Sequence, residues 1–530
     1  MSELQILATH LAMTCGGVIR SVSEESEEIV LVLPVEALTA AIEALQRESQ
    51  ARFVDLFAVA GYPSTGTLQL HLLFALDEAQ AWLHLLTELA QEGAAFPSLV
   101  DRLPATDWYE RVVWEETGAL PRGHPFLQRL RLPASWPERL WTQRADFSWS
   151  QAQPTAADEA GAVELEEAPP GVVDYPLGPV RSGVVESGHF RLRTVGEELV
   201  DVHLQLFYKH RGLEKRAEGL SPELLPLVAE RITGTSAFSH SLALCQALER
   251  LAGVQVPLRA RFLRTILGEL ERLFNHLGYQ ADLCQATGLV VAQAQFDILK
   301  ERVLRLNAAI SGHRYLFGMN VPGGLSRDLA KADIAAIEAL SRECRGALEE
   351  LHSLLLNSSS HNDRLEETGI LPPDEARAYS VVGPIGRASG IDRDLRRDHP
   401  YAAYGEVQFE VPVLQKGDAF ARSQIRLEEA RQSLFIIEQA LKRLPLGEVR
   451  VPMPPLPPGG SALGWAETPH GEAVHWLLVG EDATLRRYRV RPASFANWQA
   501  FPIAIPGHNI LTDFPVIEQS FGLSIAGANS

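Results

Sequence analysis

Three long segments with helical periodicity constrain the fold of this chain most strongly. In LRARFLRTILGELERLFNHLGYQADLCQ (258–285) and FDILKERVLRLNAAISGHRYLF (296–317), apolar residues recur at positions i, i+3, i+4 and i+7. A third segment, DLAKADIAAIEALSRECRGALEELHSLLLN, covers 328–357 with a similar pattern. Helices of this length span a whole domain. The region from about 222 to 360 is therefore predicted to be a buried helix bundle.

Strand patterns flank this helical region on both sides. Near the N-terminus, EEIVLVLP and TLQLHLLFAL surround the helical pattern VEALTAAIEALQRE, which predicts an antiparallel sheet with helices. HFRLRTVGEELVDVHLQLFY predicts short strands, and EAVHWLLV and LRRYRVRP predict more strands after a Pro/Gly hinge at 451–460. The predicted fold class is α+β, with an N-terminal α/β domain at 1–150 and a mainly helical domain with peripheral strands at 172–530.

The segment between these two domains is predicted to be a flexible linker. Residues 151–171, QAQPTAADEAGAVELEEAPPG, are acidic, rich in Ala and Pro, and free of aromatic side chains. Such a segment cannot bury enough apolar surface to offset the entropy lost on ordering.

The charge of the chain limits its partners. A formal net charge of −19 repels nucleic acid and anionic lipid headgroups, so no nucleic-acid partner is expected. The sequence has neither a run of about 18 apolar residues nor a basic, apolar leader at MSELQILATHLAMTCGG. We therefore expect a cytoplasmic chain that reaches a membrane only through other subunits.

The cysteines predict neither a metal clip nor a disulfide framework. Cys15, Cys245, Cys284 and Cys344 are scattered along the chain without a close pair. Each is interpreted as a small buried apolar residue, because free cysteine is among the most buried residue types.

Ordered motifs carry a resemblance to a known family. ATDWYERVVWEETGALPRGHPFLQRLRLP resembles the signature of the thirty-kilodalton-type subunit of respiratory complex I, and the matching residues are Trp108, Tyr109, Glu110, Arg111, Gly123, His124 and Pro125. GPVRSGVVESGHFRLR, YKHRGLEKRAEG, LGELERLFNHLG, VPGG, GPIGRASGIDRDLRRDHPYAAY, GDAFARSQIRLEEARQS and AETPHGEAVHWLLV then follow in the order of large-subunit blocks. From about 60 to 530 the chain resembles the fused large subunit of group 4, formate hydrogenlyase-type nickel-iron hydrogenases. That family is related to the fused thirty- and forty-nine-kilodalton-type subunits of complex I.

The resemblance implies a place in a membrane-associated electron-transfer complex. The implied partners are a small subunit that holds an iron-sulfur cluster, a ferredoxin-like subunit, and antiporter-like and anchor subunits in the membrane. It also implies a position on the inner face of the cell membrane and chemistry of the NADH:quinone oxidoreductase type, with NAD and a quinone as redox partners of the complex.

The departures from the hydrogenase pattern concern the metal ligands. The family resemblance implies two CxxC motifs whose four thiolates hold nickel and iron, because such a centre requires soft ligands. In this chain the four positions fall on Thr233, Ser236, Ser524 and Gly527. Hydroxyl groups and a glycine do not replace thiolates. The expectation is therefore that this chain binds no metal, holds no cofactor of its own and has no hydrogenase activity.

The residues that the resemblance implies as quinone ligands of complex I also differ in this chain. The resemblance implies a His and a Tyr as hydrogen-bond donors to the quinone headgroup, and these positions fall on Ser187 and Gly234. Ser187, His189 and His240 lie in nearby motifs and are candidate donors to a quinone-like headgroup, because a neutral imidazole titrates in the working range. The alternative interpretation is that they are ordinary core or surface polar groups.

Charged residues supply the remaining candidates. Glu214 in HRGLEK matches a glutamate that the resemblance implies as an entry point for protons, and its alternative interpretation is a first-turn acid paired with Lys215 or Arg211. The motifs GRASGIDRD and GDAFAR contribute a charge-rich set that the resemblance places around the substrate cavity, namely Arg387, Asp392, Arg393, Asp418 and Arg422. A structural ion-pair network is the favoured interpretation of this set, because buried charges must be paired. AETPHGE is interpreted as a turn at the cavity mouth with a solvated His470.

Two functional hypotheses follow. In the first, electrons from a neighbouring cluster reduce a quinone or another small acceptor in the cavity of the lost metal site, coupled to ion movement in the membrane. The predicted cavity residues are Ser187, His189, Thr233, Gly234, Ser236, His240, Arg387 and Asp418, with Glu214 as a proton relay. In the second, the subunit is a redox-silent structural or coupling element of an antiporter-like complex.

Overall fold

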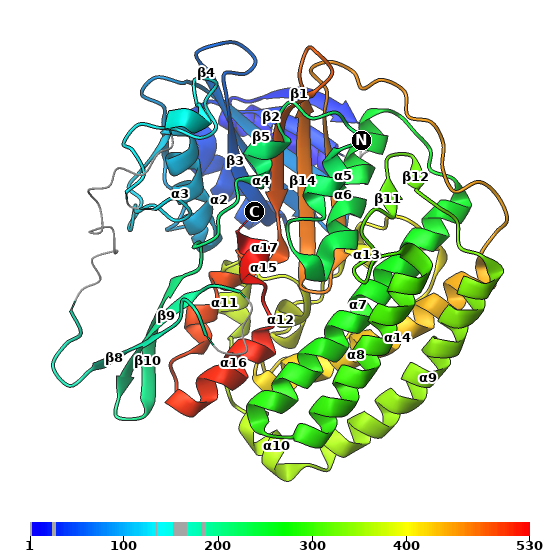
Figure 1. Ribbon diagram of the computed structural model, residues 1–530. Helices are drawn as coiled ribbons and strands as arrows, with labels where there is room; N and C mark the ends of the chain where they lie inside the picture. Colours follow the sequence, from blue (N-terminus) through cyan, green and yellow to red (C-terminus); the bar gives the residue numbers. More distant parts are fainter. Residues whose placement is uncertain (1–2, 24–27, 134, 152–166, 182–185, 530) are drawn as a thin grey trace. The chain divides into compact units, whose positions relative to one another are not determined.

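The computed structural model describes residues 3–23, 28–133, 135–151, 167–181 and 186–529. The chain divides into two compact units, one running to Glu167 with the addition of Ala378–Ser380, and one formed by the rest of the chain from Ala168 onward. Most of the predicted linker falls on 152–166 and lies outside the described residues. Figure 1 shows the first unit in blue and cyan and the second unit in the colours from green to red.

The first unit is built on a five-stranded sheet with the order β1-β2-β5-β4-β3. Its strands are β1 (Val18–Ser23), β2 (Glu28–Val32), β3 (Arg52–Ala60), β4 (Thr67–Leu76) and β5 (Ala81–Ala90). The predicted antiparallel pairing is confirmed for β1–β2, β3–β4 and β4–β5, and it is wrong for β2 and β5, which pair in parallel. The helices of this unit are α1 (Glu3–Cys15), α2 (Leu38–Glu48) and α3 (Asp107–Thr117), and a small parallel pair joins β6 (Ala95–Pro97) to β7 (Leu120–Arg122).

The N-terminal signature has a structural explanation in α3. The buried carboxylate of Glu110 accepts hydrogen bonds from the backbone N–H of Leu99 at 2.7 Å and from Ser98 Oγ at 2.7 Å. The carboxylate of Glu115 accepts from the N–H groups of Leu130 at 2.9 Å and Arg131 at 3.1 Å. Both glutamates therefore hold loops against α3 by satisfying buried backbone donors.

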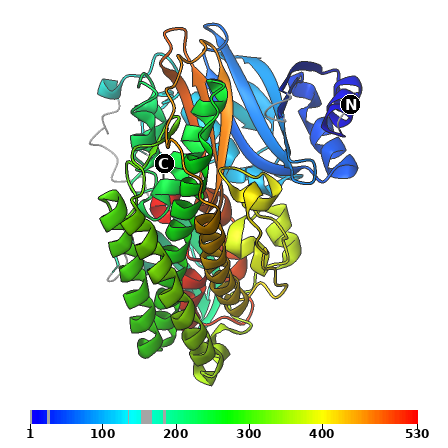
Figure 2. The same cartoon turned by 90° about the vertical axis from the view of Figure 1, so that its right-hand side faces the viewer.

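The second unit contains the helix bundle predicted for about 222–360, with one further long helix, α14, that was not predicted. Its long helices are α7 (Leu258–Thr287), α8 (Val290–Ser311), α9 (Lys331–Leu356) and α14 (Ala419–Arg443). Figures 1 and 2 show these four helices running side by side. Gly288 ends α7 with a φ of 80°, a left-handed conformation that glycine adopts without steric cost, and α8 starts two residues later. The apolar periodicity of 258–285 is thus explained by burial on the neighbouring helices of the bundle.

A sheet and a helix complete the core beside the bundle. Strands β13 (Ser461–Thr468), β14 (Gly471–Val479) and β15 (Leu485–Arg491) form an antiparallel sheet, and α6 (Ala237–Leu251) packs on it. The two strands predicted here are confirmed, whereas β13 was not predicted. β8 (Val173–Leu177), β9 (His189–Val195) and β10 (Glu198–Gln205) form a second sheet, which contains the hairpin expected from HFRLRTVGEELVDVHLQLFY.

Short elements connect these layers. They are α4 (Leu213–Ala217), α5 (Leu225–Ala229), β11 (Asn320–Val321), β12 (Gly324–Leu325), α10 (Ser359–Leu365), α11 (Pro373–Ala378), α12 (Gly383–Ala388), α13 (Leu395–Asp398), α15 (Ala493–Trp498), α16 (Phe514–Phe521) and α17 (Ile525–Ala528). All four cysteines are buried, as predicted. Over the described ranges, no helix combines the length and the hydropathy that a membrane span requires.

The contact between β13 and α6 allows no side chain at Gly464. A Cβ atom built on Gly464 would lie 1.9 Å from the carbonyl oxygen of Ala243 in α6. We predict that Gly464→Ala destabilises the chain by about 2 kcal/mol or more, because the strand must move away from the helix. Calorimetric unfolding measures this change.

A matched control is available on the bundle. Gly346 lies on an exposed part of α9, and a Cβ atom there meets nothing within 4 Å. Gly346→Ala is expected to stabilise the chain by about 0.5–1 kcal/mol through helix propensity. Equal effects of the two substitutions would contradict the close packing of β13 on α6.

Candidate functional site

The structure brings the expected metal-ligand positions together from both ends of the second unit. Thr233 precedes the short 3-10 turn Gly234–Ser236, and Ser524 is the N-cap residue of α17. The Oγ1 atom of Thr233 lies 3.2 Å from the Oγ atom of Ser524, although 291 residues separate them in the sequence. The N–H group of Gly527 donates to the same Ser524 Oγ at 2.8 Å. Hydroxyl groups thus meet each other at the positions where the family resemblance implies thiolates.

The fourth position, Ser236, begins a buried chain of polar side chains. Ser236 Oγ lies 3.0 Å from His470 Nδ1, and the other ring nitrogen of His470, Nε2, forms a short hydrogen bond with the hydroxyl group of Tyr279. Ser236 and His470 are 1% and 5% exposed. Serine, imidazole and phenol therefore form one connected donor and acceptor set, contributed by the start of α6, the turn between β13 and β14, and α7.

The prediction of a solvated His470 is wrong. The residue lies in the tight turn between β13 and β14, and its N–H group donates to Thr468 Oγ1 at 3.2 Å. Burial, together with the nearby guanidinium of Arg426, lowers the pKa of His470 to about 3, so its imidazole is neutral near pH 7. A neutral imidazole has one N–H group, so it donates on one side and accepts on the other.

Glu186 is a site residue that the sequence analysis missed. Its Oε1 atom accepts a hydrogen bond from Ser524 Oγ at 2.9 Å, and its Oε2 atom accepts a short one from the N–H group of Ile525. The available signal was its position directly before Ser187, inside the motif GPVRSGVVESGHFRLR. Arg211 holds the same C-terminal helix, because it donates to the carbonyls of Ile232 at 2.7 Å and Ala526 at 2.9 Å. A half-buried carboxylate is therefore held against the hydroxyl group of Ser524.

The predicted histidine donors occupy two other places. His189 Nδ1 lies 3.1 Å from Gln205 Oε1 across the β9–β10 hairpin. His240 Nδ1 lies 2.9 Å from His475 Nε2, and His475 Nδ1 lies 2.7 Å from the hydroxyl group of Tyr488. Burial lowers the pKa of His240 to about 3. His240 thus belongs to a separate buried chain between α6 and the sheet, and Ser187 is a half-buried loop residue.

Gly234 has room for a small side chain. A Cβ atom at Gly234 would lie 3.8 Å from the ring of Tyr315, which is an ordinary van der Waals distance. An alanine therefore fits at this position, whereas larger side chains press on Tyr315 or on the turn itself.

Glu214 is a buried carboxylate with partners on β15. Its Oε2 atom accepts from Arg487 Nη1 at 2.9 Å, and its Oε1 atom lies 3.4 Å from Arg489 Nη1. Of the alternatives considered from the sequence, Lys215 pairs with Glu218 at 2.6 Å. Glu214 therefore joins α4 to β15 through charges that are far apart in the sequence.

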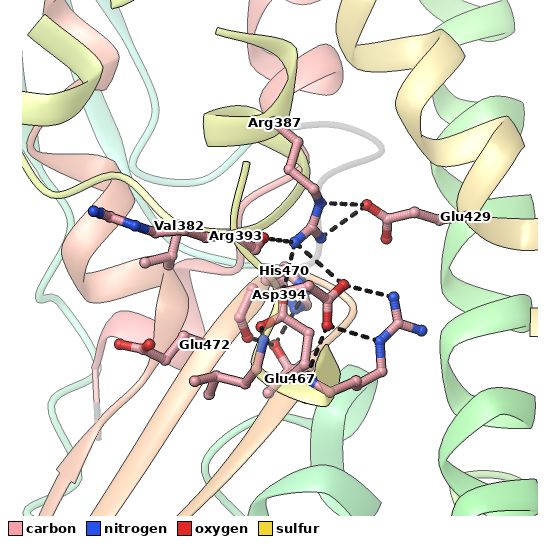
Figure 3. A network of polar contacts seen from close by, with 12 residues as sticks. Val382, Arg387, Arg393, Asp394, Glu429, Glu467, His470 and Glu472 are labelled. Atoms are coloured by element: carbon pink, nitrogen blue, oxygen red, sulfur yellow. Dashed lines mark hydrogen bonds and ion pairs between the residues drawn. The ribbon is translucent and has the colours of Figure 1, made fainter. Parts of the chain in front are cut away.

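The predicted charge-rich set is divided between three places. Arg387 belongs to a buried network with Glu429 and Glu467, drawn in Figure 3. Asp392 forms an exposed pair with Arg397 at 2.6 Å. Asp418 is the N-cap residue of α14 and accepts from the N–H group of Ala421 at 2.7 Å, which satisfies an otherwise free backbone donor. The interpretation as one structural network thus holds for Arg387 and not for the whole set.

Two arginines of α14 hold the C-terminal segment in place. Arg422 donates to Ser520 Oγ at 2.8 Å and lies over the ring of Phe521. Arg426 donates to the carbonyls of Ser520 and Phe521, both at 2.6 Å, and lies over the ring of Tyr279. These carbonyls end α16, where the helix dipole favours a positive charge. Burial lowers the pKa of Arg426 to about 10, so the guanidinium remains charged near pH 7.

Comparisons with known proteins agree with this architecture. The family model of the 30 kDa subunit of respiratory-chain NADH dehydrogenase matches residues 31–153, and the model of the 49 kDa subunit matches residues 295–458. Formate hydrogenlyase subunit 5 of Escherichia coli (strain K12) is 33% identical over 95% of this chain and 89% of its own length. Hydrogenase-4 component G of the same organism is 30% identical over 97% of this chain and 90% of its own length.

Two further similarities extend the comparison. An NADH-quinone oxidoreductase subunit of Gluconacetobacter diazotrophicus is 30% identical over 83% of this chain and 80% of its own length. A solved chain of the membrane-bound sulfane sulfur reductase, an archaeal respiratory membrane complex, superposes with a TM-score of 0.64 at 26% identity, covering 68% of this chain and 99% of that chain. The protein therefore belongs to the family of fused 30 kDa and 49 kDa-type complex I subunits, related to the large subunits of formate hydrogenlyase and hydrogenase-4.

The arginine clamp on the C-terminal segment leads to a prediction. Arg426→Leu leaves two buried carbonyl groups without their charged donor, so we predict a loss of about 3 kcal/mol of stability and faster amide hydrogen exchange at 520–527. Hydrogen-exchange mass spectrometry measures the local change.

The control uses a surface arginine. Arg345 forms an exposed pair with Glu438 at 2.6 Å, so Arg345→Leu is expected to cost about 1 kcal/mol or less. Unchanged exchange at 520–527 in the Arg426 variant would contradict a positioning role for this side chain.

Proposed function

We propose that this chain is the large subunit of a membrane-associated electron-transfer complex and takes part in reducing a quinone or another small acceptor. We further propose that this reduction is coupled to ion translocation. Support comes from its relatives, which include an NADH-quinone oxidoreductase subunit and a chain of a respiratory membrane complex, with high coverage of both.

The proposal includes the loss of the nickel-iron centre. The residues at the four ligand positions do not fit such a centre, because Thr233 and Ser524 offer protonated hydroxyl groups and Gly527 has no side chain. The two hydroxyl groups are also engaged with each other and with Glu186. In the part of the chain that the structure describes, no three His, Cys, Asp or Glu side chains are grouped to hold a metal ion.

The observation that carries the proposal is the chain Tyr279–His470–Ser236. Complex I relatives are expected to bind the quinone headgroup with a histidine and a tyrosine, and this chain lacks both at the corresponding Ser187 and Gly234. A different histidine and tyrosine are joined here by a hydrogen bond next to the old ligand positions. They supply the same imidazole and phenol chemistry from other elements of the fold.

The proton requirement of the reaction matches this set. Reducing a quinone to a quinol consumes two electrons and two protons, and the electrons come from outside this chain. We propose that the hydroxyl and imidazole groups donate hydrogen bonds to the oxygens of the headgroup and pass protons along the chain. Glu186 is a carboxylate next to this set and is proposed to return protons through Ser524. A relay through Glu214 remains a prediction.

The proposed partners follow the family. Electrons are proposed to arrive from an iron-sulfur cluster in a small subunit, and a ferredoxin-like subunit is a further proposed partner. Antiporter-like and anchor subunits are proposed to attach the chain to the inner face of the cell membrane. The similarity to the sulfane sulfur reductase makes a sulfane sulfur compound a second candidate acceptor. The hard O–H and N–H donors of the site favour the quinone.

The first test follows the iron-sulfur signal of the purified complex. The complex is reduced chemically, a soluble quinone is added, and reoxidation is monitored by electron paramagnetic resonance. We expect quinone to reoxidise the cluster in the wild type and in Gly234→Ala, and much more slowly in Gly234→Leu, because only the larger side chain presses on Tyr315 or on the turn.

Three other results would contradict the proposed function or its proposed site. Reoxidation by polysulfide but not by quinone would replace the proposed acceptor. A cluster that neither compound reoxidises would favour the redox-silent structural role. Equal rates in the two Gly234 variants would place the acceptor elsewhere.

The second test removes one hydroxyl group. Tyr279→Phe keeps the ring under Arg426 but removes the hydroxyl group that is bonded to His470. We predict a roughly hundredfold slower quinone-dependent reoxidation, which is a typical loss for a proton donor, measured by stopped-flow absorbance. Tyr208→Phe, at an exposed tyrosine bonded to Gln205, is the control and should react at the wild-type rate. A wild-type rate in Tyr279→Phe would remove this residue from the proposed site.

A further inference from the structure

A buried network of charged side chains lies beside the proposed site and has unequal numbers of positive and negative groups. Figure 3 shows part of it around Arg387. The network contains three guanidinium groups and four carboxyl groups, and all seven side chains are at most 2% exposed. They are Arg272, Arg387, Arg396, Glu269, Asp394, Glu429 and Glu467.

Three of the four carboxylates have close cationic partners. Glu429 lies 2.8 Å from Arg387, and Asp394 accepts from two nitrogens of Arg396 at 2.9 and 2.7 Å. Glu269 lies 3.1 Å from Arg396 and accepts further hydrogen bonds from the hydroxyl groups of Tyr404 and Ser433, both at 2.6 Å. These contacts use all sides of the Arg396 guanidinium. The charges of these three carboxylates balance the three guanidinium groups.

Glu467 is the fourth carboxyl group. Its Oε1 atom lies 3.1 Å from Arg387 Nη1, which also lies 3.4 Å from Asp394 and donates to the carbonyl of Arg393 at 2.7 Å. Its Oε2 atom lies 3.3 Å from the N–H group of Leu395. Glu467 therefore shares one already engaged nitrogen with Asp394.

One further guanidinium, that of Arg426, interacts electrostatically with Glu429, but its nitrogens donate to the backbone carbonyls of Ser520 and Phe521. The other neighbours of Glu467 are groups already counted, neutral groups or separately paired groups. Arg272 of α7 donates to the backbone carbonyls of Glu467 and Thr468, and Tyr401 offers a neutral phenol next to the backbone of Glu467. Glu472 lies directly opposite on β14 and forms its own ion pair with Arg491.

The histidine of the network does not balance the charge either. His276 Nε2 lies 2.9 Å from Glu429, but burial lowers the pKa of His276 to about 4, so the ring is neutral near pH 7. An excess negative charge in a buried site is costly, and protonation removes it. In agreement, burial and the charge of Asp394 raise the pKa of Glu467 to about 7, whereas the pKa of Asp394 is lowered to about 2.

Two elements, β13 with its following turn and α7, carry residues of both the charged network and the proposed acceptor site. Glu467 lies three residues before His470, near the end of β13, and the turn between them carries His470 to Ser236 and Tyr279. On α7, His276 lies one turn before Tyr279. A change of charge at the site therefore changes the proton affinity of Glu467, because Coulomb interactions are weakly screened in a buried environment.

We propose that Glu467 carries the exchangeable proton of this network and takes up a proton when negative charge builds up at the neighbouring Ser236–His470–Tyr279 site. The exchange is a simple ionisation, in which the carboxylate oxygen gains or loses one proton and no electrons move. The coupling to electron arrival rests on the proposed function, whereas the ionisation itself does not. Glu467 is proposed to act through its charge on the neighbouring site and not by contact with the acceptor.

The ionisation is tested without turnover by infrared difference spectroscopy of the purified complex. Spectra at pH 6 and pH 8 are compared for the wild type, Glu467→Gln and Glu472→Gln. Burial also raises the pKa of Glu110, Glu115 and Glu271 to about 7, so the wild type should show several carboxyl groups that ionise. We expect one of these carbonyl bands to be lost in Glu467→Gln and all to remain in Glu472→Gln. An unchanged set of bands in Glu467→Gln would overturn the proposal.

Stability against pH gives a second readout with a definite sign. The pKa of Glu467 is raised in the folded state, so the folded chain binds this proton more tightly than the unfolded chain. The contribution of Glu467 to stability is fully present below the ordinary carboxyl pKa of about 4.5 and is lost as the pH rises to about 7. We expect the melting temperature of the wild type to fall more between pH 5 and 7.5 than that of Glu467→Gln. Parallel pH curves would contradict the assignment.

The link to the acceptor is tested separately by the pH profile of cluster reoxidation. If the protonated form supports the reaction, the wild-type rate should fall by up to about tenfold for each pH unit above 7, whereas Glu467→Gln should lack this dependence. A pH-dependent infrared band together with a pH-independent wild-type rate would support the ionisation of Glu467 but would contradict its coupling to electron transfer. Absence of quinone-dependent reoxidation at any pH would overturn the proposed function and leave the infrared result to decide the ionisation.

Discussion

The second unit is organised around buried pairs of guanidinium and carboxylate groups. Arg387, Arg396 and Arg272 are almost completely buried, and each depends on acidic partners from other parts of the chain. Removing one partner from such a pair leaves an uncompensated charge in a medium of low polarity, which is far more costly than the loss of an exposed pair. The network therefore specifies how α7, α12, α14 and the end of β13 meet. The turn that carries His470 is positioned as part of the same arrangement.

The site next to this network is assembled from distant segments. Thr233 and Ser236 lie just before α6, whereas Ser524 is the N-cap residue of α17 near the other end of the unit. Arg422 and Arg426 hold the end of α16 by donating to Ser520 and neighbouring carbonyls, and this segment leads directly to Ser524. The hydroxyl groups of Thr233 and Ser524 are thus held together by hydrogen bonds between segments from both ends of the unit.

The similarity to known proteins establishes the family, whereas the chemistry must be inferred from the site residues. Similarity over most of the chain establishes the family, because formate hydrogenlyase subunit 5 and hydrogenase-4 component G match nearly the whole sequence. The chemistry depends on individual side chains, since a fold carries many functions. Here the side chains around Ser236 are hydroxyl, phenol and neutral imidazole groups. Such groups suit hydrogen bonding and proton transfer to an oxygen-containing acceptor, and they do not suit a soft metal.

The sequence alone determined α7, α8 and α9, because their apolar periodicity is a local pattern that burial on neighbouring helices explains, whereas α14 was not predicted. It also determined the hairpin after His189, the burial of the cysteines and the family, which rests on ordered motifs. The hydroxyl side chains of Thr233 and Ser236 were equally visible. These features depend on residue identity and spacing within one segment.

The tertiary structure decided the remaining features, because they depend on contacts between segments that are remote in the chain. A parallel pair of β2 and β5 cannot be read from alternating hydrophobicity, which is the same in both strand directions. His470 was predicted to be solvated because it lies in a turn motif, yet α6 and α7 bury that turn. Glu186 was overlooked because only the fold brings Ser524 to it, across a sequence separation of 338 residues. The environment of Glu467 likewise depends on which guanidinium and carboxylate groups the fold brings next to it.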